Sequence, residues 1–152
     1  MKGYKTMTDF NDLDYDEQVE IIRKANEPIL AGFEQWLVKK GLTKKTIHRH
    51  LENVAFFAQY LTYYEPLKPL VGADFTNFSS FCSDWFPRKA MWASANSAKA
   101  NLTSFRKFTA FMVDAKHWDA EHAQDIRDDF KENKAEYIES AESYYDQYLD
   151  DW

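Results

Sequence analysis

Apolar residues along this chain recur at the three- and four-residue spacing of amphipathic helices. No segment shows the two-residue alternation that predicts a half-buried β-strand. Glycine and proline number only four each, so few turns interrupt the pattern. The sequence therefore predicts an all-α protein, and we expect a compact bundle of four to six helices.

Helix boundary signals divide the first forty residues into two predicted helices. One begins at Asp14 or Asp16, because both residues suit an N-cap position. A second begins after Asn26, with Pro28 tolerated in its first turn, and ends at Gly41. Its apolar side is expected to hold Ile29, Leu30, Phe33, Trp36 and Leu37.

The next helix is predicted to begin after the N-cap Thr43 and to end before Pro66. Its buried stripe is expected to contain Ile47, Leu51, Val54, Ala58 and Leu61. Asp74 suits the cap of a short aromatic helix, and Pro87 predicts a loop over residues 86–93.

A long helix is predicted from about Ser94 to Ala115, and Asp119 opens a final helical segment. The long helix should bury Ala98, Leu102, Phe105, Thr109 and Met112. We divide the chain into an N-terminal arm at residues 1–14, a helical domain at 15–118 and an acidic helical extension at 119–152.

Composition narrows the class of protein further. The 152 residues fit one domain, and 17% of them are aromatic, which favours helices packed through large rings. One cysteine, Cys82, fits a reducing compartment, and the early acidic residues do not resemble a signal peptide. The most apolar run is too short to cross a membrane. We therefore expect a soluble cytoplasmic protein with no membrane partner.

Charge is segregated along the chain, whose formal net charge is -6. Residues 1–118 carry a net charge of +3, and residues 119–152 carry -9. Two stretches, residues 39–50 and 85–113, contain cations and no acidic residue. Such segregation is expected of a surface that faces a polyanion, because carboxylates among the cations would repel phosphate.

The cations of these stretches fall opposite the apolar stripes when each segment is wound as a helix. Lysines at the start of the helix capped by Thr43 oppose the helix dipole unless an anion lies nearby. The sequence therefore predicts DNA contacts from Thr43, Lys44, Lys45, Thr46, His48, Arg49, Arg88, Lys89, Lys99, Thr103, Arg106 and Lys107. The simpler interpretation of any one cation is a solvated helix face.

Residues 27–115 resemble the N-terminal core-binding (SAM-like) domain of the tyrosine recombinase and phage integrase family. The resemblance is carried by Phe33-Glu34-Gln35-Trp36-Leu37, Gly41-Leu42-Thr43, Thr46-Ile47, Leu51, Phe57 and Tyr60-Leu61, and by Ser97 to Phe108. It implies a helical bundle that arches over duplex DNA and contacts it through the helices beginning at Thr43 and near Ser94. His50 stands where the family pattern more often has tyrosine.

The sequence does not contain the residues that the family uses for strand cleavage. No His-x-x-Arg signature follows any of the four histidines, and Tyr144, Tyr145 and Tyr148 lie in an acidic helix that would repel phosphate. We therefore predict no enzyme activity, no catalytic residue, no cofactor, no metal site and no small-molecule substrate. His48 and His50 are expected to be exposed beside the basic stretch, and Cys82 is expected in the core.

Two functional interpretations remain open. The first is a DNA-binding module that grips the duplex backbone, either alone or with a recombinase or another protein as partner. The alternative is a protein-interaction bundle of the same fold, in which the acidic extension covers the basic face and DNA is not bound.

Overall fold

A computed structural model of the chain describes residues 10–150, and its side chains up to residue 144. The predicted arm therefore lies mostly outside the described residues, apart from a short helical turn at residues 10–12. The remaining elements are α2 (Tyr15–Lys39), α3 (Lys44–Tyr60), η1 (Leu70–Gly72), α4 (Phe75–Ser80), η2 (Phe81–Trp85), α5 (Phe86–Lys89), α6 (Ala95–Asp114) and α7 (Ala120–Asp150). No strand occurs in this described part of the chain, so the predicted all-α fold is confirmed.

The first predicted pair of helices is a single helix, α2, and the predicted break at Asn26 is wrong. Asp14 caps α2 in a capping box with Glu17, as the sequence indicates. Asn26 lies inside the helix and is buried, and its Oδ1 accepts a hydrogen bond from the backbone N–H of Leu70 at 2.9 Å. Pro28 is exposed on the solvent side of the helix, which continues through it. Asn26 thus ties α2 to the η1 turn and does not start a new helix.

The turn between α2 and α3 follows the predicted signals. Gly41 adopts a left-handed conformation with φ of 81°, which a residue without Cβ adopts at little cost. Thr43 caps α3 through a hydrogen bond from the backbone N–H of Thr46. Ile47, Val54, Ala58 and Leu61 are buried as predicted, while Leu51 is half-buried.

The predicted loop at residues 86–93 is wrong over its first half. The α4, η2 and α5 segments follow one another without a break from Phe75 to Lys89. The backbone N–H of Phe86 bonds to the carbonyl of Phe81, a π-type spacing that accommodates the chain before Pro87. Pro87 lies in the first turn of α5, where a missing N–H costs little.

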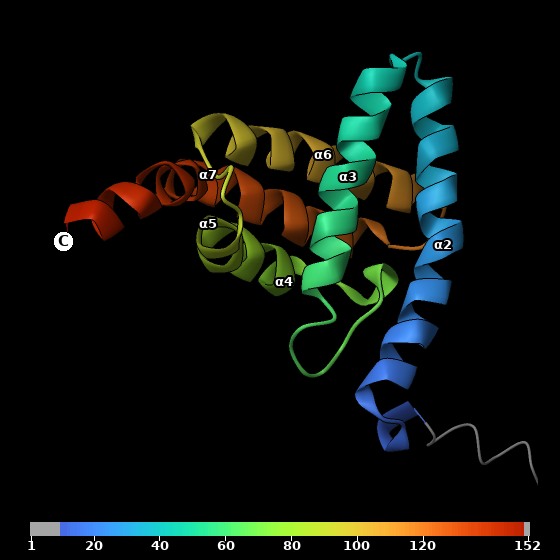
Figure 1. Cartoon of the computed structure of the whole chain (residues 1–152). Coiled ribbons are helices and arrows are strands. Elements are labelled where there is room, and N and C mark those ends of the chain that lie inside the picture. The colour runs from blue at the N-terminus through green and yellow to red at the C-terminus, as the bar shows by residue number, and fades with distance from the viewer. Residues whose placement is uncertain (1–9, 151–152) are drawn as a thin grey trace, which may run out of the picture.

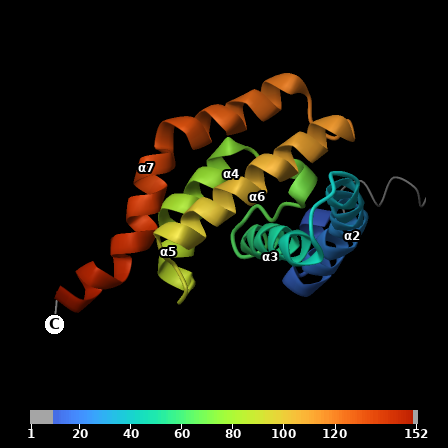
Figure 2. The ribbon, with the colours of Figure 1, turned by 90° about the horizontal axis from the view of Figure 1, so that it is seen from above.

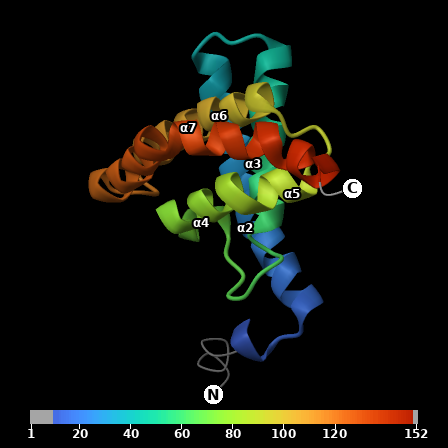
Figure 3. The same ribbon diagram turned by 90° about the vertical axis from the view of Figure 1, so that its left-hand side faces the viewer.

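Three groups of helices are stacked in the fold. The α2–α3 hairpin crosses one side of α6, and α7 packs along α6, α4 and α5. Figure 1 shows α3 lying across α6, and Figure 2 shows α6 between α3 and α7. Figure 3 shows α6 and α7 side by side, with α4 and α5 beneath them.

The acidic segment after residue 118 shares the core of the preceding helices. Ile126 and Phe130 of α7 are 0% exposed, and Tyr137 is 1% exposed. The Phe130 ring meets the rings of Phe78 and Phe105 at centroid distances of 5.4 and 6.2 Å. The predicted boundary at residue 118 therefore does not separate two cores. Most of the described acidic residues of α7 are exposed, whereas Asp129 is buried and accepts a hydrogen bond from the Tyr137 hydroxyl at 2.7 Å.

Candidate nucleic-acid interface

Most of the side chains predicted to contact DNA are accessible to solvent. Those that are exposed are Thr43, Lys44, Lys45, His48, Arg49, Arg88, Lys89, Lys99 and Thr103, and those half-buried are Thr46, Arg106 and Lys107. Exposure alone does not make them one surface, since they come from α3, α5 and α6.

A buried polar junction joins α3 to α6 at their crossing. His50 is 5% exposed and its Nδ1 lies 2.7 Å from the Oγ of Ser104, which is fully buried. The Nδ2 of Asn53 donates to the same Oγ at 3.0 Å. The prediction of an exposed His50 is therefore wrong. The residue lies on the side of α3 that faces α6, and Ser104 satisfies its ring nitrogen.

One cation from each helix, Arg49 of α3 and Lys107 of α6, acts electrostatically on His50 in this junction. Burial lowers the pKa of His50 below its usual value, and the positive charges of Lys107 and Arg49 lower it further. Both cations must lie close enough to His50 for their fields to act on it, although they are 58 positions apart in the chain. Arg49 adjoins His50 and Lys107 lies about one turn after Ser104, so the contact between His50 and Ser104 brings these parts of α3 and α6 together.

Helical spacing places further polar residues on the same sides of α3 and α6 as Arg49 and Lys107. Lys45 precedes Arg49 by one turn of α3, and Thr103 and Lys99 precede Lys107 by one and two turns of α6. We call these five residues, Lys45, Arg49, Lys99, Thr103 and Lys107, the α3–α6 basic face. Among the residues described, no carboxylate lies within 4.0 Å of any of its four cations.

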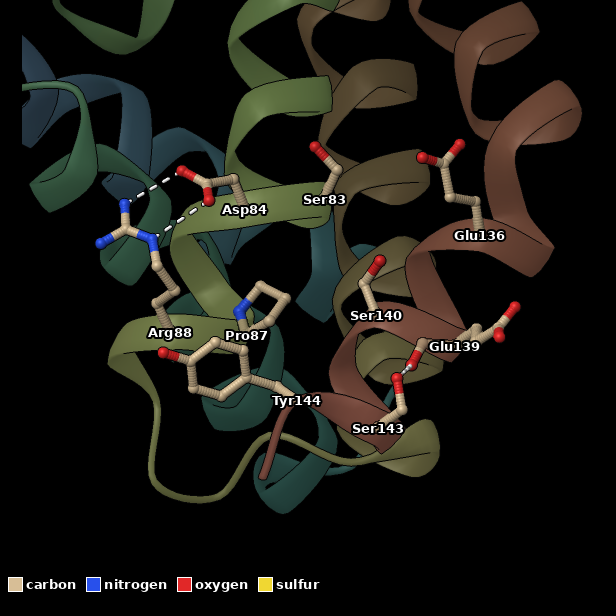
Figure 4. Close-up of a pocket in the computed structure, with 9 residues that line it drawn as sticks. All are labelled: Ser83, Asp84, Pro87, Arg88, Glu136, Glu139, Ser140, Ser143 and Tyr144. Carbon is tan, nitrogen blue, oxygen red and sulfur yellow. Dashed lines mark hydrogen bonds and ion pairs between the residues drawn. The ribbon is translucent and has the colours of Figure 1, made fainter. Parts of the chain in front are cut away.

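Arg88 is not counted in the α3–α6 basic face, because it forms an ion pair with Asp84. Its Nε and Nη2 donate to the two carboxylate oxygens of Asp84 at 3.1 and 2.9 Å. Figure 4 shows this pair at one edge of a pocket of about 360 Å³ that Glu136 and Glu139 of α7 also line. Asp84 lies just outside the acid-free stretch in sequence, but helical spacing places it against Arg88. The surroundings of Arg88 are unfavourable for a phosphate group.

Other residues that were predicted to contact DNA also form contacts within the protein. His48 pairs with Glu52 at 2.7 Å, and the guanidinium of Arg106 lies 6.0 Å from the Phe130 ring centroid. The hydroxyl of Thr43 caps α3 and bonds to that of Thr46. These residues flank the α3–α6 basic face and do not complete it. Lys89 lies apart on α5.

The start of α6 is closed to a phosphate group by two internal contacts. Ser94 and Ser97 form a capping box there. The backbone N–H of Ala95 donates to Oε2 of Glu142 on α7 at 2.6 Å. A carboxylate at a helix N-terminus is favourable, because it faces free N–H groups and the positive end of the dipole. The α3–α6 basic face therefore depends on side chains rather than on this helix end.

The buried junction of His50, Asn53 and Ser104 was missed by reasoning from the sequence alone. A signal for it was present, because His50 is three residues after Ile47 and four before Val54, both in the predicted stripe. Ser104 is likewise next to the buried Phe105. Polar residues within a predicted apolar stripe indicate a buried contact, and here that contact positions the two basic helices.

Acidification is expected to weaken the fold through His50. The unfolded chain takes up a proton near pH 6.5, whereas the folded protein keeps His50 neutral to lower pH. This contribution to stability is present above pH 6.5 and is lost as pH falls through the lowered pKa. Urea unfolding of His50→Gln between pH 7.5 and 5 should show a shallower loss of stability than the wild type. His48→Gln, an exposed control, should follow the wild type, and identical slopes in all three proteins would contradict this assignment.

Neither a family model, nor a curated protein, nor a solved structure matches this chain. None of the helices in the described part of the chain is both long and apolar enough to cross a membrane. Within the same residues no three histidine, cysteine or carboxylate side chains gather as metal ligands would. Cys82 is buried as predicted, and its burial raises the pKa of the thiol.

Proposed function

We propose that this protein is a DNA-binding module that grips the backbone of duplex DNA through the α3–α6 basic face. The observation that carries the proposal is the contact between His50 and Ser104, which holds together the acid-free segments of α3 and α6 that carry Arg49 and Lys107. Cations gathered on two adjoining helices repel one another in an isolated protein, and a phosphate backbone lying along them would relieve that repulsion. The resemblance to the recombinase core-binding domain assigns DNA contact to the same two helices.

The distribution of acid supports this choice of face. α7 carries most of the excess negative charge and packs on the side of α6 away from α3 (Figure 2). Its described residues therefore do not lie over Lys45 or Arg49. The alternative function, in which the acidic segment covers the basic face, has less support than DNA binding for this reason.

The strength of duplex binding should depend steeply on salt. If the four cations of the α3–α6 basic face each contact one phosphate, the logarithm of the association constant should fall with a slope of roughly -4 against the logarithm of salt concentration. Fluorescence anisotropy with a labelled blunt duplex, repeated at several potassium chloride concentrations, measures this slope. The slope should be similar for unrelated duplex sequences, since backbone contacts carry no base information. Absence of binding at the lowest salt would contradict the proposal.

A further inference from the structure

An aromatic pocket of about 680 Å³ opens beside the C-terminal end of α3. Its walls come from α3 with the turn after it, from η2 and α5, and from the loop before α6. They include Phe56, Tyr63, Tyr64, Trp85, Lys89 and Trp92. The proposed duplex contact uses none of these residues, although the sequence grouped Lys89 with the other cations.

Three rings of this pocket, those of Tyr63, Tyr64 and Trp92, are exposed. Trp92 is 59% exposed and Tyr63 is 48% exposed, although both lie against buried rings. The centroid of Phe56 lies 5.3 Å from that of Trp92 and 5.0 Å from that of Trp85, and Tyr63 lies 5.8 Å from Trp85. Exposed ring faces held by a rigid aromatic base form a platform for stacking.

One buried side-chain atom of a residue that lines the pocket lacks a hydrogen-bond partner. Trp85 is 3% exposed, and its Nε1 is buried without an acceptor, the one such side-chain atom found in the described part of the chain. A buried N–H without an acceptor is costly, so Trp and Tyr donors in cores normally have one. Trp85 closes the π-type turn η2, a feature that often marks functional positions.

The charge at the pocket favours an anionic ligand. Lys89 has no carboxylate within 4.0 Å among the described residues, and Asp84 nearby is neutralised by Arg88. Phe56 follows Arg49 by seven residues, so it lies on the same side of α3 and about 10 Å further along the axis. The pocket and the α3–α6 basic face thus occupy one side of this helix.

We propose that the pocket holds an unstacked nucleobase of a single strand, with its phosphate on Lys89. This inference rests on the proposed function for the neighbouring duplex, and the base itself would stack on Trp92 or Tyr63. Aromatic stacking accepts any base, because every base has a π-face. A quaternary ammonium ligand also favours aromatic walls, but Lys89 would repel it. A duplex whose end continues as a single strand would engage both surfaces at once.

The experiment compares a blunt labelled duplex with the same duplex carrying a five-thymidine overhang, and includes the thymidine decamer alone. The overhang should tighten binding about fivefold or more, the effect of one stacked base. Trp92→Ala should remove this gain and leave blunt-duplex binding unchanged, and Lys89→Ala should reduce the gain. Met91→Ala, a change at an 86% exposed neighbour outside the pocket wall, is the matched control and should keep the gain.

The thymidine decamer separates this inference from the proposed function. Quenching of tryptophan fluorescence by the decamer, lost in Trp92→Ala, would support the pocket even if the blunt duplex did not bind. An overhang that gives no gain, together with a decamer that gives no quenching, would overturn the inference while leaving duplex binding intact. Quenching by a proline decamer but not by the thymidine decamer would also overturn it, in favour of a peptide ligand.

Discussion

A chain ending at residue 118 is expected to lose cooperative folding. That truncation removes the buried side chains of α7, among them Ile126, Phe130 and Tyr137, and exposes the rings of Phe78 and Phe105 that they cover. Loss of one buried phenylalanine typically costs about 3–5 kcal/mol, and the whole stability of a domain is only about 5–15 kcal/mol. The truncated chain should therefore show neither a sigmoidal thermal transition nor dispersed amide resonances.

Two point variants make the same test within the full chain. Phe130→Ala should lower the free energy of unfolding by about 3 kcal/mol or more, measured by urea denaturation. Glu132→Ala, at an exposed position two residues away, should change it by less than about 0.5 kcal/mol. A truncated chain with an undiminished cooperative transition would show that residues 15–118 fold without α7.

The second large effect is expected from reversing charge on the α3–α6 basic face. The double variant Arg49→Glu and Lys107→Glu replaces one cation of each helix near the His50–Ser104 contact with a carboxylate facing the phosphate backbone. Like charges placed in an interface cost several kcal/mol, so duplex affinity should fall on the order of a hundredfold or more. Both residues lie outside the hydrophobic core, and the fold should be retained.

A matched control separates local contact from overall charge. Lys24→Glu with Lys131→Glu changes the net charge by the same amount, at exposed positions on α2 and α7. This control should weaken binding only a few fold, through long-range repulsion that salt screens. Equal losses in the two double variants would place the binding surface elsewhere.

Helix caps and apolar stripes allowed most of the fold to be predicted from the sequence. Asp14, Thr43 and Asp74 cap helices as expected, and Ser94, the predicted start of the long helix, is its N-cap. An N-cap requires only a local side-chain hydrogen bond, so sequence can indicate it. The long-range contact of Asn26 with Leu70 and the π-type turn before Pro87 could not be predicted, since both depend on packing between distant segments. The sequence predicts an acidic helical extension after residue 118, and the packing of this helix on α4 and α6 likewise depends on distant segments.

The sequence could indicate which residues of the candidate site are exposed cations, but not which of these cations lie together on one surface. Solvent exposure of Lys45, Arg49 and Lys99 follows from helical spacing alone. Whether Arg49 and Lys107 lie on the same surface depends on the angle at which α3 crosses α6, and no local sequence pattern encodes that angle. The ion pair of Arg88 with Asp84 lies four residues apart on a segment that the sequence assigned partly to a loop, and it was missed for that reason.

Amide chemical-shift mapping with a blunt duplex tests the central claim most directly. Titration of the full chain at low salt should shift resonances over residues 45–53 of α3 and 99–107 of α6, while those of residues 15–30 on α2 remain in place. Reversal of these shifts by added salt should accompany release of the duplex. Shifts confined to α2 or α7, or no shifts at a large excess of duplex, would contradict duplex binding through the α3–α6 basic face.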